Sequence, residues 1–139
     1  MKKIIILGAG IPHVKKNPSI LFKIFKNHNT LDFIREKFKK YSKNITLVTG
    51  YKSHKINKNQ EIQIIKNHNW KNTKSFGSLL LNDLTQLDEV IIVYSDIFFD
   101  EGLIDTLIKS KSDVTFFYSS QKLQNPYKEN VLIKKKKIS

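Results

Sequence analysis

Short continuous apolar runs alternate along the chain with stretches in which apolar residues recur every three to four positions. The runs 4–7, 45–49, 61–65, 90–94 and 114–118 are rich in β-branched and aromatic residues and predict strands. The stretches between them predict helices that cover the sheet. The pattern indicates an α/β protein with three Rossmann-like layers around a mostly parallel central sheet.

Three amphipathic helices are predicted. The first begins at a cap formed by Asn29 or Thr30 and ends near Ser42. The second is capped by Ser75. Its inward side is expected to consist of Phe76, Leu79, Leu80, Leu84 and Leu87. The third covers residues 100–110 and leads to the strand at 114–118.

Two strand ends carry candidate chemistry. Gly8, Ala9 and Gly10 follow the first strand, and Asp96 follows the strand 90–94, whose almost wholly apolar sequence predicts a central place in the sheet. Because parallel strands joined by right-handed crossovers end at one edge of a sheet, both segments are expected at the same edge. Ligands bind at this edge in open α/β sheets.

The glycine segment allows two interpretations. Glycines at positions 8 and 10 permit close approach of a ligand and present N–H groups that hold phosphate oxygens. The alternative is a tight turn without a ligand. A dinucleotide-binding fingerprint is disfavoured because His13 occupies its third glycine position, and no Gly-Lys-Ser/Thr follows to make a P-loop.

Asp96 also allows two interpretations. An ionised carboxylate that ends an apolar strand is costly to desolvate unless a cation or hydrogen-bond donors compensate. A magnesium ion bridging triphosphate oxygens would compensate. The alternative is a cap on the helix that follows, a role for which Asp100 competes.

Composition limits the classes of function. A chain of 139 residues with 40% apolar residues is expected to fold as one domain. It has no cysteine, which excludes disulfides and thiolate chemistry. No apolar run approaches the roughly 20 residues of a membrane-spanning helix, so a cytoplasmic protein without a membrane span is expected.

The net charge of +13 comes almost entirely from lysine, and Arg35 is the one arginine. Nucleic-acid recognition favours arginine forks, and no aromatic-basic stripe is present, so a solvated lysine-rich surface is the favoured interpretation. The basic C-terminal segment 121–139, with its block at 134–137, is expected to be a solvated tail.

The order of short motifs over residues 2–118 resembles the nucleotidylyltransferase family, in particular its sugar-1-phosphate and choline-phosphate members. The motifs are the glycine segment 8–10, Pro18-Ser19-Ile20-Leu21, Thr30-Leu31-Asp32-Phe33, 45–51 ending in Thr49-Gly50-Tyr51, Asn72-Thr73, Ser78-Leu79 and Val93-Tyr94-Ser95-Asp96. The resemblance implies a single NTP-transferase-like domain over 1–139.

By the same resemblance, Gly8, Ala9 and Gly10 would bind the nucleotide and Asp96 would bind Mg²⁺. Gly77 and Ser78 would lie near the base or ribose. From the residues themselves, Tyr51 with Trp70 is a candidate for stacking on a base or a choline group, against the alternative that the aromatic rings pack at a strand end.

The implied reaction transfers a nucleotidyl group from CTP or UTP/dTTP to a sugar 1-phosphate or phosphocholine, as in cell-surface polysaccharide biosynthesis. Lys15 and Lys16 are candidates for neutralising phosphate charge.

Three departures from the family pattern leave open a catalytically incomplete nucleotide-binding domain. Pro12-His13 stands where the family has an arginine, and Ser19 where it has a lysine. The family's second metal aspartate and most of its acceptor half are expected from sequence beyond Ser139, so a fragment, a split-gene half with a separate C-terminal partner and a degenerate binding domain stay open. A homo-oligomer is the other partner left open.

Overall fold

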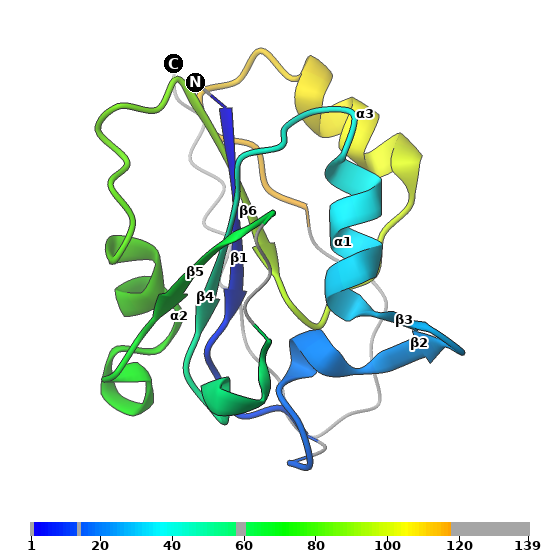
Figure 1. Ribbon diagram of the computed structural model, residues 1–139. Helices are drawn as coiled ribbons and strands as arrows, with labels where there is room; N and C mark the ends of the chain where they lie inside the picture. The colour runs from blue at the N-terminus through cyan, green and yellow to red at the C-terminus, as the bar shows by residue number, and fades with distance from the viewer. Residues whose placement is uncertain (1, 14, 58–60, 118–139) are drawn as a thin grey trace. The chain divides into compact units, whose positions relative to one another are not determined.

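The computed structural model describes residues 2–13, 15–57 and 61–117 (Figure 1). The chain divides into two compact units, Met1–Lys109 and Ser110–Ser139, and the described helices and strands lie in the first. The basic segment 121–139 lies outside the described residues, and a single domain over the whole chain stays a prediction.

Four parallel strands form the central sheet in the order β5-β4-β1-β6. Their bounds are Lys2–Gly8 for β1, Ile45–Thr49 for β4, Gln63–Lys66 for β5 and Glu89–Tyr94 for β6. β1 pairs with β4 on one side and β6 on the other, so that Gly8 lies opposite Thr49 and Leu7 opposite Tyr94. The α/β class and the parallel sheet are confirmed.

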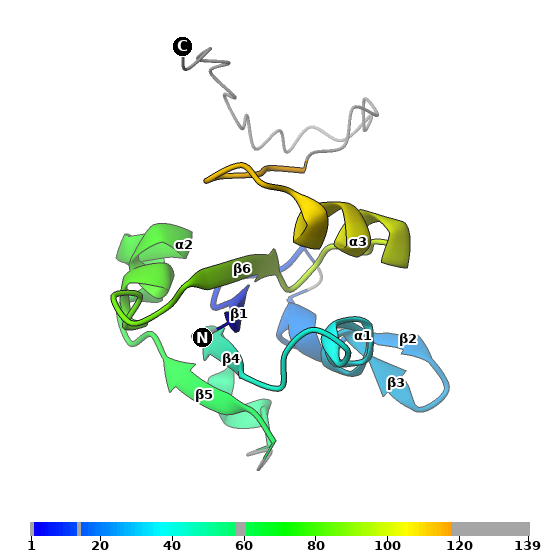
Figure 2. The same cartoon turned by 90° about the horizontal axis from the view of Figure 1, so that it is seen from above.

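Helices cover both faces of the sheet (Figures 1 and 2). They are α1 at Thr30–Phe38, α2 at Trp70–Leu80 and α3 at Glu101–Lys109. Alternate residues of β1 point to opposite faces. Ile4 and Ile6 pack with the buried sides of α1 and α3, whereas Ile5 and Leu7 pack on the α2 side.

The first helix begins where the sequence predicts. The Asn29 side chain accepts a hydrogen bond from the Asp32 N–H at 3.0 Å, and the Asp32 carboxylate accepts one from the Asn29 N–H at 3.1 Å. This reciprocal pair is a capping box. The expected end near Ser42 is wrong, because α1 stops at Phe38 and the Tyr41 N–H then turns back onto the Phe38 carbonyl.

The second helix differs from its prediction in its start, its end and its orientation, and Leu84 and Leu87 lie beyond its last residue, Leu80. It begins at Trp70, and its helical geometry breaks at Lys74 (φ 51°, ψ −150°), directly before the predicted cap. Phe76 and Leu80 are 71% and 61% exposed, so their expected inward placement is wrong. The physical reason is a buried polar contact, because fully buried Ser78 faces the sheet side and turns Phe76 and Leu80 outward.

Three strand predictions need correction. β5 begins at Gln63 rather than Glu61. β6 is an edge strand of the described sheet, with Ile92 45% exposed, because apolar content alone does not distinguish an edge strand from a central one. Residues 114–117 contain no strand, and Tyr118 lies outside the described residues.

Four short elements were not predicted. They are the 3₁₀ turns η1 at Ser19–Leu21 and η2 at Ser53–Lys55, and the antiparallel hairpin of β2 at Lys23–Phe25 and β3 at His28–Asn29. They lie in the connections that precede α1 and follow β4. None of the described helices is long and apolar enough to cross a membrane.

Candidate functional site

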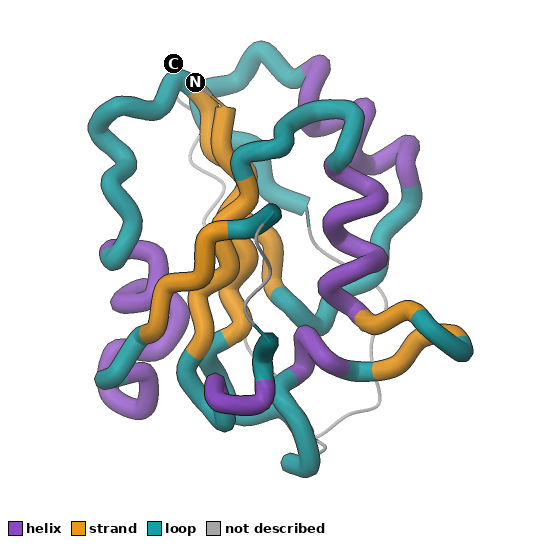
Figure 3. Tube along the Cα trace, viewed as in Figure 1, coloured by secondary structure: helices purple, strands orange, loops and turns teal. Residues whose placement is uncertain are grey.

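The last residues of β1 touch the segment that follows β6 at the carboxyl edge of the sheet. The Ser95 N–H donates to the Leu7 carbonyl at 3.1 Å, and a Cβ on Gly8 would lie 3.3 Å from the Ser95 Cβ. The loops that leave β1 and β4 emerge at this same end (Figure 3). Gly10 and Asp96, which directly extend β1 and β6, therefore belong to one edge, as the sequence predicts.

The glycines of this edge have different surroundings. Gly8 is buried and leaves room for Ser95, so its missing side chain serves packing within the protein. Gly10 is exposed, and a Cβ there would meet nothing within 4 Å. Gly50 is packed most tightly, since an added Cβ would lie 2.6 Å from the Trp70 Cγ and 2.7 Å from the Ala9 carbonyl oxygen. Open space that a ligand could fill lies beside Gly10.

Asp96 is exposed, so the expectation that it needs a cation to offset burial is wrong. The capping role belongs to Asp100, whose Oδ1 accepts a hydrogen bond from the Leu103 N–H at 2.8 Å. The Asp96 side chain makes no hydrogen bond or ion pair with another described residue. Its carboxylate is therefore available to a ligand.

Asp96 fits the chemistry of a magnesium site that takes one protein carboxylate and completes its coordination with phosphate and water oxygens. In the described part of the chain, no three His, Asp or Glu side chains lie close enough together to bind a metal ion. The donor set is therefore compatible with a metal that arrives together with a phosphorylated ligand.

Tyr51 joins the β4 loop to the glycine segment. Its N–H donates to the Ala9 carbonyl at 2.9 Å, and its hydroxyl donates to the Lys15 carbonyl at 2.6 Å. Its ring meets Trp70 edge to face at a centroid distance of 5.9 Å. The two rings thus pack on each other, which is the alternative to base stacking that the sequence left open.

Lys15 and Lys16 are exposed, and their backbone carbonyls are held by side chains of the β4 loop. Lys52 and Lys55 from this loop donate to the carbonyl oxygens of residues 15 and 16. Sequence reasoning missed both lysines, because a lysine in a lysine-rich chain gives no signal until its partner is known.

Ser19 and Ser95 form a buried hydrogen bond between their hydroxyl groups. Ser19 occupies the position at which the family resemblance leads one to expect a lysine. Its side chain points into the protein at 6% exposure and cannot present a polar group to an exposed ligand. This position therefore contributes packing to the edge and no positive charge.

Gly77 and Ser78 lie in α2, and Ser78 contacts the carboxyl edge through Asn67. The buried Asn67, just after β5, donates from Nδ2 to the Ser78 Oγ at 2.9 Å and to the Thr73 Oγ1 at 3.0 Å. A Cβ on Gly77 would collide with the Thr73 Cβ at 2.1 Å. Both residues therefore support the position of Asn67, for which the sequence alone gives no signal.

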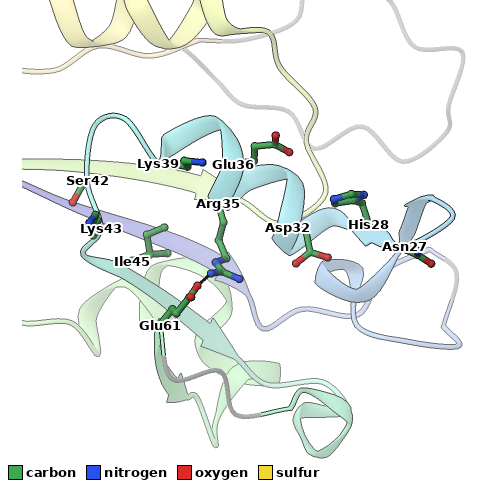
Figure 4. A pocket seen from close by; sticks show the side chains of 10 residues that line it. All are labelled: Asn27, His28, Asp32, Arg35, Glu36, Lys39, Ser42, Lys43, Ile45 and Glu61. Carbon is green, nitrogen blue, oxygen red and sulfur yellow. Dashed lines mark ion pairs between the residues drawn. The ribbon is translucent and has the colours of Figure 1, made fainter.

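A separate cavity of about 840 Å³ lies beside α1 and the amino ends of β4 and β5 (Figure 4). Its wall contains Arg35, which forms an ion pair with Glu61, together with Asp32, Lys43 and Ile45. None of the predicted site residues lines it. The one arginine of the chain is therefore engaged away from the carboxyl edge.

No protein-family model matches the chain, and no curated protein matches it.

Proposed function

We propose that the chain binds a nucleoside triphosphate with Mg²⁺ at the carboxyl edge of β1, β4 and β6 and transfers its nucleotidyl group to a phosphorylated acceptor. The observation that carries the proposal is the direct contact of Ser95, the residue after β6, with Leu7 and Gly8 at the carboxyl end of β1. Exposed backbone at Gly10 and a carboxylate at Asp96 then serve the same ligand.

The strand order supports this proposal. The chain proceeds from β1 to β4 on one side and returns to β6 on the other, an order compatible with a Rossmann-like sheet. Open α/β sheets bind ligands where the strand order reverses, and here that point lies between β1 and β6.

In the proposed reaction, a phosphate oxygen of a sugar 1-phosphate or phosphocholine attacks the α-phosphorus of CTP, UTP or dTTP. A new phosphorus–oxygen bond forms, the bond from the α-phosphorus to the α,β-bridging oxygen breaks, and pyrophosphate leaves. Gly10, the exposed residue of the glycine segment, positions the phosphates through its backbone N–H group, and Lys15 and Lys16 contribute positive charge. Asp96 would hold Mg²⁺, which supplies charge neutralisation when bound.

One observation favours a second function, which is nucleotide binding without turnover. Ser19 is buried against Ser95, so a cation expected from the family resemblance is absent at that position. A chain that lacks one phosphate-neutralising group retains binding through the glycine segment more readily than it retains catalysis.

Pyrophosphate release from CTP, UTP or dTTP, measured with each acceptor and Mg²⁺, tests the proposal. The variant Asp96→Asn is expected to lose activity about 100-fold or more. Asp83→Asn is the matched control, because Asp83 is exposed and lies in the connection that enters the opposite end of β6. Saturable nucleotide binding without release supports the second function, and absence of nucleotide binding contradicts both.

A further inference from the structure

The ammonium groups of Lys52 and Lys55 donate hydrogen bonds to uncharged oxygens of the segment 15–17. Lys52 Nζ donates to the Lys15 carbonyl at 2.9 Å and to the Lys16 carbonyl at 3.3 Å. Lys55 Nζ donates to the Lys16 carbonyl at 3.1 Å and to Asn17 Oδ1 at 3.0 Å. Since no acceptor is charged, both positive charges remain uncompensated by these contacts.

Each ammonium group also keeps a hydrogen-bond donor. A lysine side chain has three N–H donors, and each of these lysines uses two. In the described ranges, the lysines that form ion pairs are Lys2 and Lys37, at other places in the fold. Two cations with unused donors and no carboxylate partner form an anion-binding arrangement.

Both ammonium groups are held in place before any ligand arrives. Lys52 adopts a left-handed backbone conformation with φ 47°, which costs a residue other than glycine energy and persists only when its surroundings stabilise it. Its Nζ lies 5.1 Å from the centre of the Tyr51 ring, and the Tyr51 hydroxyl binds the same Lys15 carbonyl. Restricting flexible side chains in advance lowers the entropy that binding must offset.

We infer that Lys52 and Lys55 form a preorganised binding site for the polyphosphate of the ligand. Tyr51 links them to the glycine segment through its hydrogen bond to Ala9, so they flank the carboxyl edge at which the nucleotide is proposed to bind. The identity of the anion as a nucleotide rests on the proposed function. The two lysines supply phosphate-binding charge from the β4 loop, and residues 15–17 act as the scaffold that positions it.

Inorganic tripolyphosphate binding, measured by calorimetry on the full chain, tests the inference. Lys52→Gln and Lys55→Gln are each expected to weaken binding about tenfold, because each removes a charge-assisted hydrogen bond. Lys40→Gln is the matched control, since Lys40 is exposed after α1 and its loss changes the net charge equally. Lys55→Arg is expected to retain most of the affinity, and Tyr51→Phe to lose part of it by loosening the scaffold.

The inference is overturned if both glutamine variants bind tripolyphosphate like the wild-type chain, or if Lys40→Gln weakens binding as much as they do. Calorimetric titration of the chain with CTP, UTP or dTTP in the presence of Mg²⁺ separates the failure of this inference from the failure of the proposed function. Nucleotide binding that is unchanged in both glutamine variants overturns the lysine site alone. Lysine-dependent tripolyphosphate binding without binding of any of these nucleotides sustains the lysine site and overturns the proposed function.

Discussion

Gly50 lies where the end of β4, the glycine segment and the start of α2 meet, and its substitution by alanine tests this packing. The added Cβ would lie 2.6 Å from the Trp70 Cγ and 2.7 Å from the Ala9 carbonyl oxygen. Neither neighbour can move freely. The Ala9 carbonyl accepts the Tyr51 N–H, and Trp70 packs edge to face on the Tyr51 ring. The substitution must therefore displace backbone or a large aromatic side chain.

The expected cost follows from overpacking, which typically destabilises a protein by about 1 to 3 kcal/mol. For a unit of the size of Met1–Lys109, each kcal/mol corresponds to a shift in melting temperature of about 4 to 8 °C. Gly50→Ala is therefore expected to melt about 5 to 20 °C below the wild-type chain. Thermal unfolding followed by circular dichroism, with urea unfolding as a second measurement, gives the free energy of unfolding.

Gly10→Ala is the matched control, because a Cβ at position 10 meets nothing within 4 Å and no glycine in the described ranges has a positive φ. It is expected to melt at or slightly above the wild-type temperature. If Gly50→Ala unfolds like the wild-type chain, or Gly10→Ala is the less stable variant, the packing of this edge is not as described. The same Gly10→Ala protein should bind nucleotide more weakly while remaining folded, which separates a ligand contact from a structural defect.

Three further predictions concern contacts that hold the elements in place. Asn29→Ala removes the α1 cap and should cost about 1 kcal/mol in urea unfolding, whereas Asn29→Ser should restore most of it. Asn67→Leu leaves buried Ser78 without its donor and should cost about 1 to 3 kcal/mol, more than Asn69→Ala at the exposed neighbour. The hydrogen bond to Asp105 raises the pKa of Tyr41 above its ordinary value of 10.0, so folding favours the protonated phenol. The contribution of this hydrogen bond to the free energy of unfolding is present below pH 10 and is lost as the pH rises through the higher folded-state pKa. Urea unfolding at increasing pH should therefore show a loss of stability that Tyr41→Phe removes.

The parts of the fold that sequence predicted well are those with a local physical signal. β1 and β4 are β-branched runs that end at glycine, and Asn29 followed by Asp32 three residues later is a capping pattern. These signals depend on neighbours within a few residues, so no knowledge of the tertiary structure is needed to interpret them.

The parts that sequence reasoning missed depend on partners far away in the chain. The orientation of α2 is set by Asn67, which binds Ser78 eleven residues later, and a helical wheel assigns such a serine to the solvent side. The edge position of β6 depends on which strands pair with it, and an equally apolar sequence is expected for a strand at the edge or in the centre of the sheet. Ser19 is similar, because its burial follows from contact with Ser95 across 76 residues.

The placement of charge at the carboxyl edge connects these observations. Ser19, at a position where the resemblance leads one to expect a cation, points inward to Ser95, and Arg35 is paired with Glu61 away from this edge. The β4 loop instead carries Lys52 and Lys55, anchored on the segment that precedes Ser19. If the edge binds phosphates, its positive charge must come from this loop and from residues 15 and 16. Loss of both loop lysines should then weaken phosphate binding by more than any change at Ser19, and a Ser19→Lys substitution should destabilise the chain without strengthening binding, because it buries a charge beside Ser95.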